Sequence, residues 1–273
     1  MKNIGVLLVV IIAFLSCKKV DTTDDTLIYS CSVFQGVSVP VVEDSIKYFI
    51  DTASFQFALS GGKGVFWDFT GLNKQDSTTV YFNDKTGLKY SPLFPTSDFV
   101  STLNDELVYL ALNSNGLEVQ GAIINVSDTQ FVAFYNKTYK YYDFPLKYNQ
   151  SLTNTYSYRD MVYELVIDVD GKPIYADSLE IFRTGTITKK VDGCGKLKNA
   201  NGTYEVLRIY KEETISDTSI AHVFKGIGTK PVTFIEEENI FRTYEFVTDS
   251  LNSPIIIIDL DENKQAKSVR FRN

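Results

Sequence analysis

The sequence predicts an all-β fold in which residues 27–273 form a single antiparallel β domain with little helix. The chain has 17 tyrosines and 19 phenylalanines but only 2 methionines, and aromatic and β-branched residues favour pleated, half-buried strands. Short apolar segments alternate with turn residues, and none has the periodicity of a helix of three turns. Because long sheets twist and must hide one face, we expect a two-sheet sandwich or a strongly curved open barrel.

Short strands fill the first part of the predicted domain. They are expected at residues 37–42, 45–50, 54–59, 65–70, 80–82 and 87–90. Gly61, Gly62 and Gly64 form a tight turn before the fourth of these strands, since glycine adopts backbone angles that other residues resist. Residues 91–98 contain two prolines and are predicted to form a loop, and residues 97–103 are the best candidate for one or two helical turns.

Longer strands follow in the second part. A hairpin is expected to join residues 106–112 to 117–125, and further strands are expected at residues 131–135, 155–169, 172–190, 202–215, 240–248, 255–260 and 268–272. Asp170 and Gly171 are a strong turn signal between two of the longest strands.

The first seventeen residues have the layout of a lipoprotein signal. Lys2 supplies a positive charge, residues 4–15 form an apolar run too short to span a bilayer as a helix, and Ser16 is the small residue before Cys17. We therefore expect residues 1–16 to be a signal peptide that is removed, leaving Cys17 with acyl chains such as palmitate on its sulfur and amine. An ordinary cleaved signal with a chance cysteine is the alternative, but the A-x-A pattern of such signals is missing.

Residues 17–26 are polar and charged and are expected to be a flexible tether between the lipid and the domain. Asp21, Asp24 and Asp25 resemble the acidic signal that sends lipoproteins of Bacteroidetes to the outer face of the outer membrane. The resemblance implies a lipid-anchored outer-membrane protein, with the cell surface favoured over the periplasm.

The charge of the chain limits the partners it can bind, and its cysteine content limits the disulfides it can form. The 27 basic residues are outnumbered by 34 acidic ones, for a formal net charge of -7, whereas proteins that bind nucleic acid are basic, so no nucleic acid is expected as a partner. Cys31 and Cys194 remain after lipidation of Cys17, and an exported protein meets an oxidising compartment. Spacing does not decide whether they pair, because two cysteines allow one bridge or none.

The sequence shows none of the common catalytic patterns. His222 is the only histidine, too few for a two-histidine metal site, and no phosphate-binding loop or nucleophile elbow is present. The acidic run at residues 236–238 puts at most two carboxylates on one face of a strand and is typical of a solvated loop. Residues 259–263 have part of a calcium-loop spacing, but aspartate and asparagine also favour turns. We therefore expect no enzyme activity, no catalytic residue, no metal and no cofactor.

The aromatic surplus suggests a ligand-stacking surface, because tyrosine rings stack on sugar rings. Tyr139 and Tyr141 are the candidates, and strand alternation predicts that they share one face while Tyr142 lies on the other. Trp67 lies in an apolar run after a glycine turn and is expected in the core instead.

A repeated three-residue pattern, aspartate followed by serine or threonine and then by an apolar residue or threonine, resembles the O-glycosylation sequence of Bacteroidetes, in which the sugar is on the middle residue. The candidate attachment residues are Thr22, Thr26, Ser45, Thr52, Ser77, Ser178 and Ser250. Turn chemistry explains the same pattern, since these residue types gather where strands reverse, and both interpretations stay open.

Several landmarks occur together along the chain. They are residues 64–69 (GVFWDF), 94–95 (FP), 144–151 (FPLKYNQS), 192–197 (DGCGKL) and 202–208 (GTYEVLR). In order and spacing they resemble a family of secreted and lipid-anchored Bacteroidetes proteins, often attached to type IX secretion sorting domains, to which no activity is assigned. The resemblance covers most of residues 55–260 and implies location and a β fold. Cys194 departs from it, because an aromatic residue is usual there, so a disulfide shared by the family is not implied.

Together these observations predict an outer-membrane lipoprotein that is a non-catalytic binding or accessory module of the cell envelope, with a glycan or an envelope protein as its partner. A carrier that holds an apolar ligand in an open β barrel and a glycan-directed hydrolase are the alternatives. The carrier needs a cavity, and the hydrolase needs two carboxylates that converge in a cleft.

Overall fold

The computed structural model describes most of the chain. The described residues are 31–34, 42–52, 59–103, 106–126, 129–169, 172–224 and 229–272. They are almost entirely β, which confirms the predicted fold class; among them we find one 3-10 turn, Ser91–Leu93, and no α-helix. No helix in this part of the chain is long and apolar enough to cross a membrane.

The described strands belong to one large sheet. They are β1 (Ser45–Asp51), β2 (Gly62–Asp68), β3 (Asp76–Asp84), β4 (Phe99–Leu103), β5 (Glu106–Asn113), β6 (Gly116–Val126), β7 (Thr129–Asp143), β8 (Ser151–Val169), β9 (Lys172–Asn199), β10 (Gly202–Phe224), β11 (Thr229–Val247), β12 (Ile256–Leu260) and β13 (Ala266–Phe271). Their order is β2-β9-β10-β11-β12-β13-β1-β3-β4-β5-β6-β7, and β8 pairs with β9. The β2–β9 pair is parallel, so the sheet is mixed where we expected it to be antiparallel throughout.

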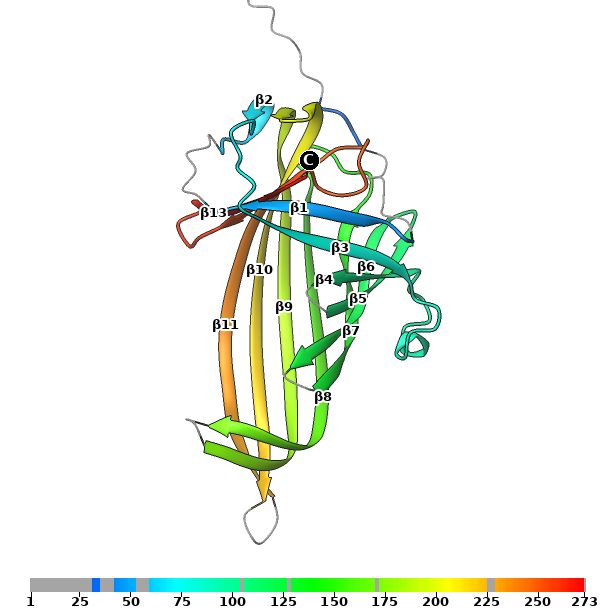
Figure 1. Cartoon of the computed structure of the whole chain (residues 1–273), viewed down its shortest axis with the longest axis vertical. Coiled ribbons are helices and arrows are strands. Elements are labelled where there is room, and N and C mark those ends of the chain that lie inside the picture. Colours follow the sequence, from blue (N-terminus) through cyan, green and yellow to red (C-terminus); the bar gives the residue numbers. More distant parts are fainter. Residues whose placement is uncertain are drawn as a thin grey trace, which may run out of the picture.

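Strands β8 to β11 are the longest, with 19 to 28 residues, and they run side by side down the long axis of the molecule (Figure 1). At ~3.3 Å per residue, β9 follows a path of roughly 90 Å. Strands β1 and β3 cross the long strands near one end (Figure 1). Strand β7 lies beside β8, but no ladder joins these two in the described residues. The molecule therefore has one curved sheet that is not closed into a barrel, and not the two sheets of a sandwich.

The long strands pass through two different environments. We call residues 187–199 of β9, 202–213 of β10 and 241–247 of β11 the near end. We call residues 157–169 of β8, 172–186 of β9, 214–224 of β10 and 229–240 of β11 the far end. The near end is crossed by β1 and β3 (Figure 1), whereas the far end contains the paired ends of β8 with β9 and of β10 with β11.

Apolar side chains cover both faces of the sheet at the near end. The inner core includes Tyr48, Leu110, Val119, Tyr142, Val191, Leu207, Val247 and Ile257. The outer core includes Trp67, Phe69, Val206, Phe246, Ile256, Ile258 and Val269. Successive residues of one strand, such as Phe246 and Val247, point to opposite faces, so a continuous apolar run is needed to fill both cores.

The outer core is held by a tryptophan and an arginine. Trp67 is buried, as expected, and its ring meets that of Phe246 edge-on, with centroids 5.1 Å apart. The guanidinium of Arg208 lies 4.2 Å from the ring centre of Tyr244 and donates to both carboxylate oxygens of Asp192, at 2.8 and 2.9 Å. Arg208 is almost fully buried, and this bidentate pairing satisfies a charge that would otherwise be costly there.

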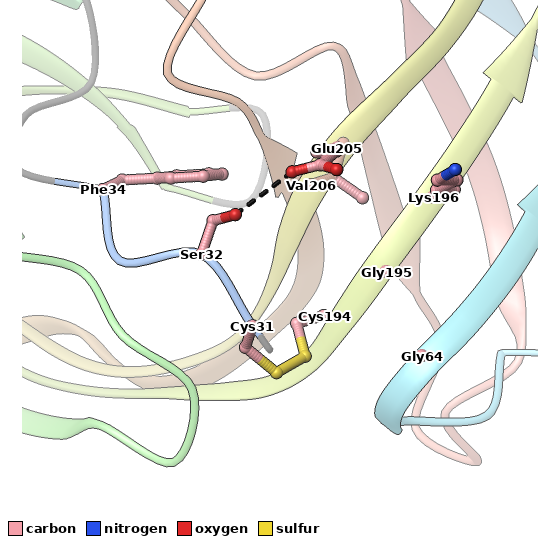
Figure 2. A pocket seen from close by; sticks show the side chains of 9 residues that line it. All are labelled: Cys31, Ser32, Phe34, Gly64, Cys194, Gly195, Lys196, Glu205 and Val206. Atoms are coloured by element: carbon pink, nitrogen blue, oxygen red, sulfur yellow. Dashed lines mark hydrogen bonds between the residues drawn. A yellow bond between two sulfur atoms is a disulfide. The ribbon is translucent and has the colours of Figure 1, made fainter. Parts of the chain in front are cut away.

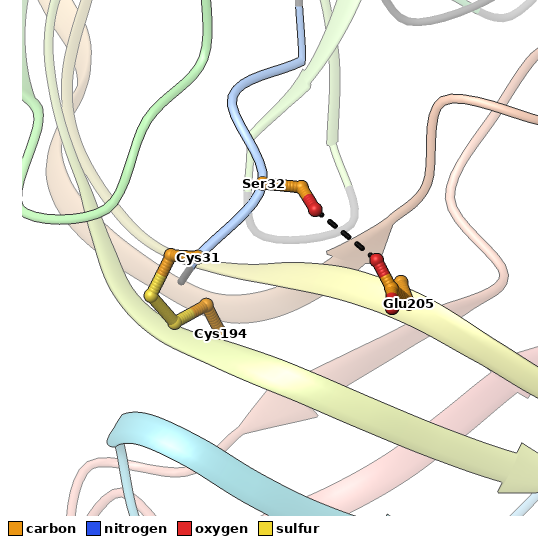
Figure 3. The surroundings of a disulfide bond; sticks show 4 residues. All are labelled: Cys31, Ser32, Cys194 and Glu205. Atoms are coloured by element: carbon orange, nitrogen blue, oxygen red, sulfur yellow. Dashed lines mark hydrogen bonds between the residues drawn. A yellow bond between two sulfur atoms is a disulfide. The ribbon is translucent and has the colours of Figure 1, made fainter. Parts of the chain in front are cut away.

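Strand β2 reaches β9 only because residue 195 is glycine. Gly195 has a φ of +159°, and a Cβ there would lie 1.9 Å from the carbonyl oxygen of Val65 on β2. The neighbouring Cys194 forms a disulfide with Cys31, with Cα atoms 5.7 Å apart (Figure 3). The segment before β1 is thus covalently attached to the near end, and the pairing that the sequence left open is present.

Several local predictions need correction. Residues 87–90, predicted as a strand, lie in turns between β3 and the 3-10 turn. Residues 97–103, our helix candidate, contain strand β4, because Phe99 and Val100 are buried on opposite faces between β3 and β5 and tertiary packing outweighs local preference. The strand predicted at residues 202–215 continues to Phe224, since β9 and β11 pair with it on both sides. The strands predicted at residues 37–42 and 54–59 lie almost entirely outside the described residues.

Candidate functional site

A stack of four tyrosines fills the space between β7 and β8. We call Tyr135, Tyr139, Tyr156 and Tyr158 the tyrosine stack. The ring of Tyr135 is central, with centroids 5.9, 5.2 and 5.8 Å from those of Tyr139, Tyr156 and Tyr158. Gly185 leaves room for it, because a Cβ there would lie 2.2 Å from the Tyr156 ring. Side chains therefore bridge the seam where no ladder joins the two strands.

Next to this stack lies a buried group of charged and hydroxyl side chains. We call Tyr141, Tyr142, Lys189 and Glu245 the inner cluster. The hydroxyls of Tyr141 and Tyr142 donate to the two carboxylate oxygens of Glu245, at 3.3 and 3.1 Å. Lys189 donates from Nζ to the carbonyl oxygen of Tyr141, and its ammonium lies 4.4 Å from the centre of that ring. Every member thus has a polar partner within the protein.

Burial changes the acidity of the inner cluster. Lys189 is only 7% exposed, and burial lowers its pKa to about 7, although Glu245 acts in the opposite direction. Burial also raises the pKa of the Tyr141 and Tyr142 hydroxyls, and the charge of Glu245 raises each further. The cluster can therefore hold a proton on Lys189 or release it near neutral pH, while its tyrosines stay protonated.

Ion pairs continue along the inner face toward the far end. Lys211 contacts Glu213 at 2.8 Å, and Glu213 also accepts a hydrogen bond from Tyr156 at 2.7 Å. Further along, Arg183 donates to both oxygens of Asp217, at 2.5 and 2.7 Å. The carboxylates of Glu213 and Asp217 are thus each paired with a cation.

Two hollows in the described part of the chain are too small for an organic ligand. One, of about 40 Å³, is lined by the Cys31–Cys194 disulfide and by Ser32, whose hydroxyl donates to Glu205 at 3.1 Å (Figure 2). The other, of about 20 Å³, lies against Lys189 in the inner cluster. Such volumes hold one to a few water molecules, so neither fits the apolar ligand of a carrier.

Large apolar side chains are exposed at the far end. Tyr163 on β8 is 67% exposed, and Val166 on β8 and Tyr175 on β9 lie opposite each other in the ladder and are 64% and 56% exposed. Strand β11 adds Val232 near the second hairpin. By strand alternation Val166 and Tyr175 lie on one face of the paired strands and Tyr163 lies on the other, so apolar side chains are exposed on both faces of this hairpin. Such exposed apolar side chains are typical of a surface that contacts another molecule.

The two predicted stacking residues are partly buried. Tyr139 contacts Tyr135 and Tyr156, and Tyr141 is covered by Lys189, so their ring faces already have neighbours. The alternation that separated Tyr141 from Tyr142 was wrong, because the pairing of β6 with β7 shifts register at Tyr141 and both hydroxyls reach Glu245. Stacking on a ligand stays a prediction, and it would require these rings to exchange their present contacts.

The glycosylation candidates differ in exposure. Ser45, Thr52, Ser77 and Ser250 are exposed, whereas Ser178 is buried and out of reach of a transferase in the folded protein. Thr22, Thr26 and the lipid attachment residue Cys17 lie outside the described residues. Modification of these residues stays a prediction.

The histidine, calcium-loop and acidic-run candidates, which we rejected on sequence grounds as catalytic or metal sites, have structural roles or neighbours in the fold. His222 Nε2 lies 3.8 Å from a carboxylate oxygen of Glu180. The backbone N–H groups of Asn263 and Gln265 both donate to Asp261, which is the turn chemistry that competes with a calcium loop. No group of three potential metal ligands occurs among the described residues. The acidic run at residues 236–238 lies in strand β11 and not in the loop that we expected.

Sequence reasoning missed Lys189 and Glu245. A weak signal existed for the lysine, because Ile187, Lys189 and Val191 alternate with exposed residues and therefore point to the same buried face. Nothing in the sequence indicates that Glu245, on another strand, would share its surroundings. Searches of protein families, curated proteins and solved structures found no match to this chain.

Proposed function

We propose that this chain is an outer-membrane lipoprotein and a non-catalytic binding module of the cell envelope, which contacts its partner through the far end of its long strands. The observation that carries the proposal is the exposure of Tyr163, Val166 and Tyr175 at the β8–β9 hairpin. Tyrosine offers a broad ring and a hydroxyl at low entropic cost, so it suits contacts with glycans and with proteins.

The position of the expected anchor supports this arrangement. Cys17 precedes Cys31 by fourteen positions, and the disulfide attaches Cys31 to Cys194 at the near end. From Cys194 back to Lys172 the strand β9 extends for roughly 70 Å at ~3.3 Å per residue. A lipid on Cys17 would therefore hold the near end toward the membrane and present the hairpins away from it.

Binding is tested with a variant of the hairpin surface. Tyr163→Ser combined with Tyr175→Ser should abolish saturable binding of the full chain to isolated envelope glycans or to detergent-solubilised envelope proteins. Tyr81→Ser is the matched control, because Tyr81 is about as exposed but lies on β3. Equal binding by the double variant and the control would overturn the proposal. Turnover of a glycan that one Asp or Glu substitution abolishes would favour the hydrolase.

Location is tested through the anchor itself. Cys17→Ser should release the protein from the membrane fraction, because acyl chains contribute ~0.8 kcal/mol for each buried methylene and a serine cannot carry them. Protease treatment of whole cells should then degrade the wild-type protein if it is on the cell surface. Retention of the variant in the outer membrane would contradict lipid anchoring.

A further inference from the structure

We propose that the free edge of β11, over residues 229–241, binds a basic extended segment of another protein as an added strand. Strand β10 pairs with β11 along its whole length, whereas β12 pairs with it only from Arg242 to Phe246. Within the described residues no strand occupies the second edge of residues 229–241. An incoming strand would lie in line with β12 and continue the sheet past the point where β12 ends. This surface is separate from the hairpin residues proposed above.

The backbone geometry shows which groups such a strand would meet. The N–H of Ile255 donates to the carbonyl oxygen of Phe246 at 2.8 Å, so the peptide groups of Phe246 point away from β10. The register of β10 with β11 is unbroken from Ile235 to Val247, and alternate residues of a strand point the same way. The backbone N–H and C=O of Glu236, Glu238 and Ile240 therefore face the free edge.

The acidic side chains along this edge favour a partner with positive charge. Glu236, Glu237 and Glu238 are all exposed, and no described cation pairs with them. Glu236 and Glu238 lie on one face of the sheet and Glu237 on the other, so the edge is acidic on both. A second copy of the same edge would place glutamate near glutamate, which protects the protein against pairing with itself.

A partner strand with three consecutive lysines or arginines would oppose these carboxylates on both faces. Ile240 and Phe241, 45% and 55% exposed, follow the glutamates on opposite faces and offer apolar contacts to the next residues of the partner. The segment we infer therefore has a short basic run flanked by β-branched residues, a composition that adopts an extended strand.

The test uses the full chain, purified in detergent, and two synthetic peptides. The probe is Thr-Val-Thr-Lys-Lys-Lys-Thr-Val-Thr, whose palindromic sequence fits the edge in either direction; its control carries three glutamates in place of the lysines. We expect the lysine peptide to bind, with amide exchange slowed at residues 236, 238 and 240. Combining Glu236→Gln, Glu237→Gln and Glu238→Gln should weaken binding about tenfold, as three cross-strand ion pairs would.

A proline variant separates strand addition from simple charge attraction. Ile240→Pro removes an N–H that faces the free edge and leaves the β10 ladder intact, so it should abolish binding; Ile240→Thr, which keeps the N–H, should bind. The proposal would be overturned if both peptides bound equally or if Ile240→Pro bound as well as the wild-type protein. It would also be overturned if the lysine peptide slowed amide exchange only at residues outside this edge. A stable dimer of the chain joined through this edge would overturn it as well. The glutamine variant and the exchange measurement decide the matter if the proline variant does not fold.

Discussion

The near and far ends of the long strands contrast sharply, although the same three strands run through both. At the near end of β10, Val206 and Leu207 are buried on opposite faces of the sheet. At the far end of the same strand, residues 214–218 are half-exposed on both faces. The backbone ladders of β10 run through both regions, with one register shift in each, so hydrogen bonding does not distinguish them.

The difference shows that covering elements, and not the strands themselves, create the cores. Strands β1, β12 and β13 bring apolar residues to one end only, and the segment around Trp67 covers the outer face there. The far end has a small cluster around Ala176, Leu179 and Ala221 together with the ion pairs of the inner face. We therefore expect the free energy of unfolding to depend mainly on the near end and binding to depend on the far end.

The largest expected effect is at the disulfide of the near end. Cys31 and Cys194 are separated by 163 residues, and a bridge closing such a loop stabilises by about 5 kcal/mol in the chain-entropy model. Cys31→Ser should lower the free energy of unfolding in urea by about that amount, whereas Val33→Ser, at a nearby exposed position, should leave it unchanged. Unfolding curves that do not respond to reduction of the wild-type protein would show that the bridge contributes little.

A core substitution at each end tests the contrast directly. Trp67→Ala should destabilise by about 4 kcal/mol, because a large buried ring is replaced by a cavity beside Phe246. Tyr163→Ala, at an exposed far-end position, should change stability by less than about 0.5 kcal/mol. Similar losses for the two variants, measured by urea unfolding, would mean that the far end is packed more tightly than its exposure indicates.

The pH dependence of stability tests the inner cluster. The pKa of Lys189 is about 7 in the folded protein and near the ordinary lysine value when unfolded, so between these values the unfolded chain binds more protons. Stability should therefore rise by about 2 kcal/mol from about pH 7 to about pH 9, which is about one unit below the ordinary tyrosine pKa. Lys189→Met should remove this rise, and a variant that keeps it would assign the rise to another group.

The smallest effect is expected at the ion pair of the far end. Arg183 and Asp217 are partly exposed, so a double-mutant cycle of Arg183→Met and Asp217→Asn should give a coupling below about 1 kcal/mol. The buried pair of Arg208 and Asp192 at the near end has the same bidentate geometry. Arg208→Met should cost more than Arg183→Met, because it leaves Asp192 without its partner. A larger loss at Arg183 would reverse the contrast between the two ends.

The β fold followed from the sequence because aromatic and β-branched residues and turn signals act locally. The apolar run around Phe246 and Val247 even indicates burial on both faces, and the tight surroundings of Trp67 were predictable from its apolar neighbours. Turn chemistry at Asp261 was likewise local, since its carboxylate accepts from backbone groups two and four residues on.

Other features were decided only by tertiary structure. Residues 99–103 form a strand because β3 and β5 flank them, and a register shift at Tyr141 turns two successive tyrosines toward Glu245. The inner cluster joins residues about fifty to one hundred positions apart, and the disulfide joins residues 163 positions apart. The local sequence of one strand does not indicate which distant strand will pair with it or face it. The composition of this chain therefore determined that it is a β protein, whereas the order and register of its strands determined which side chains meet.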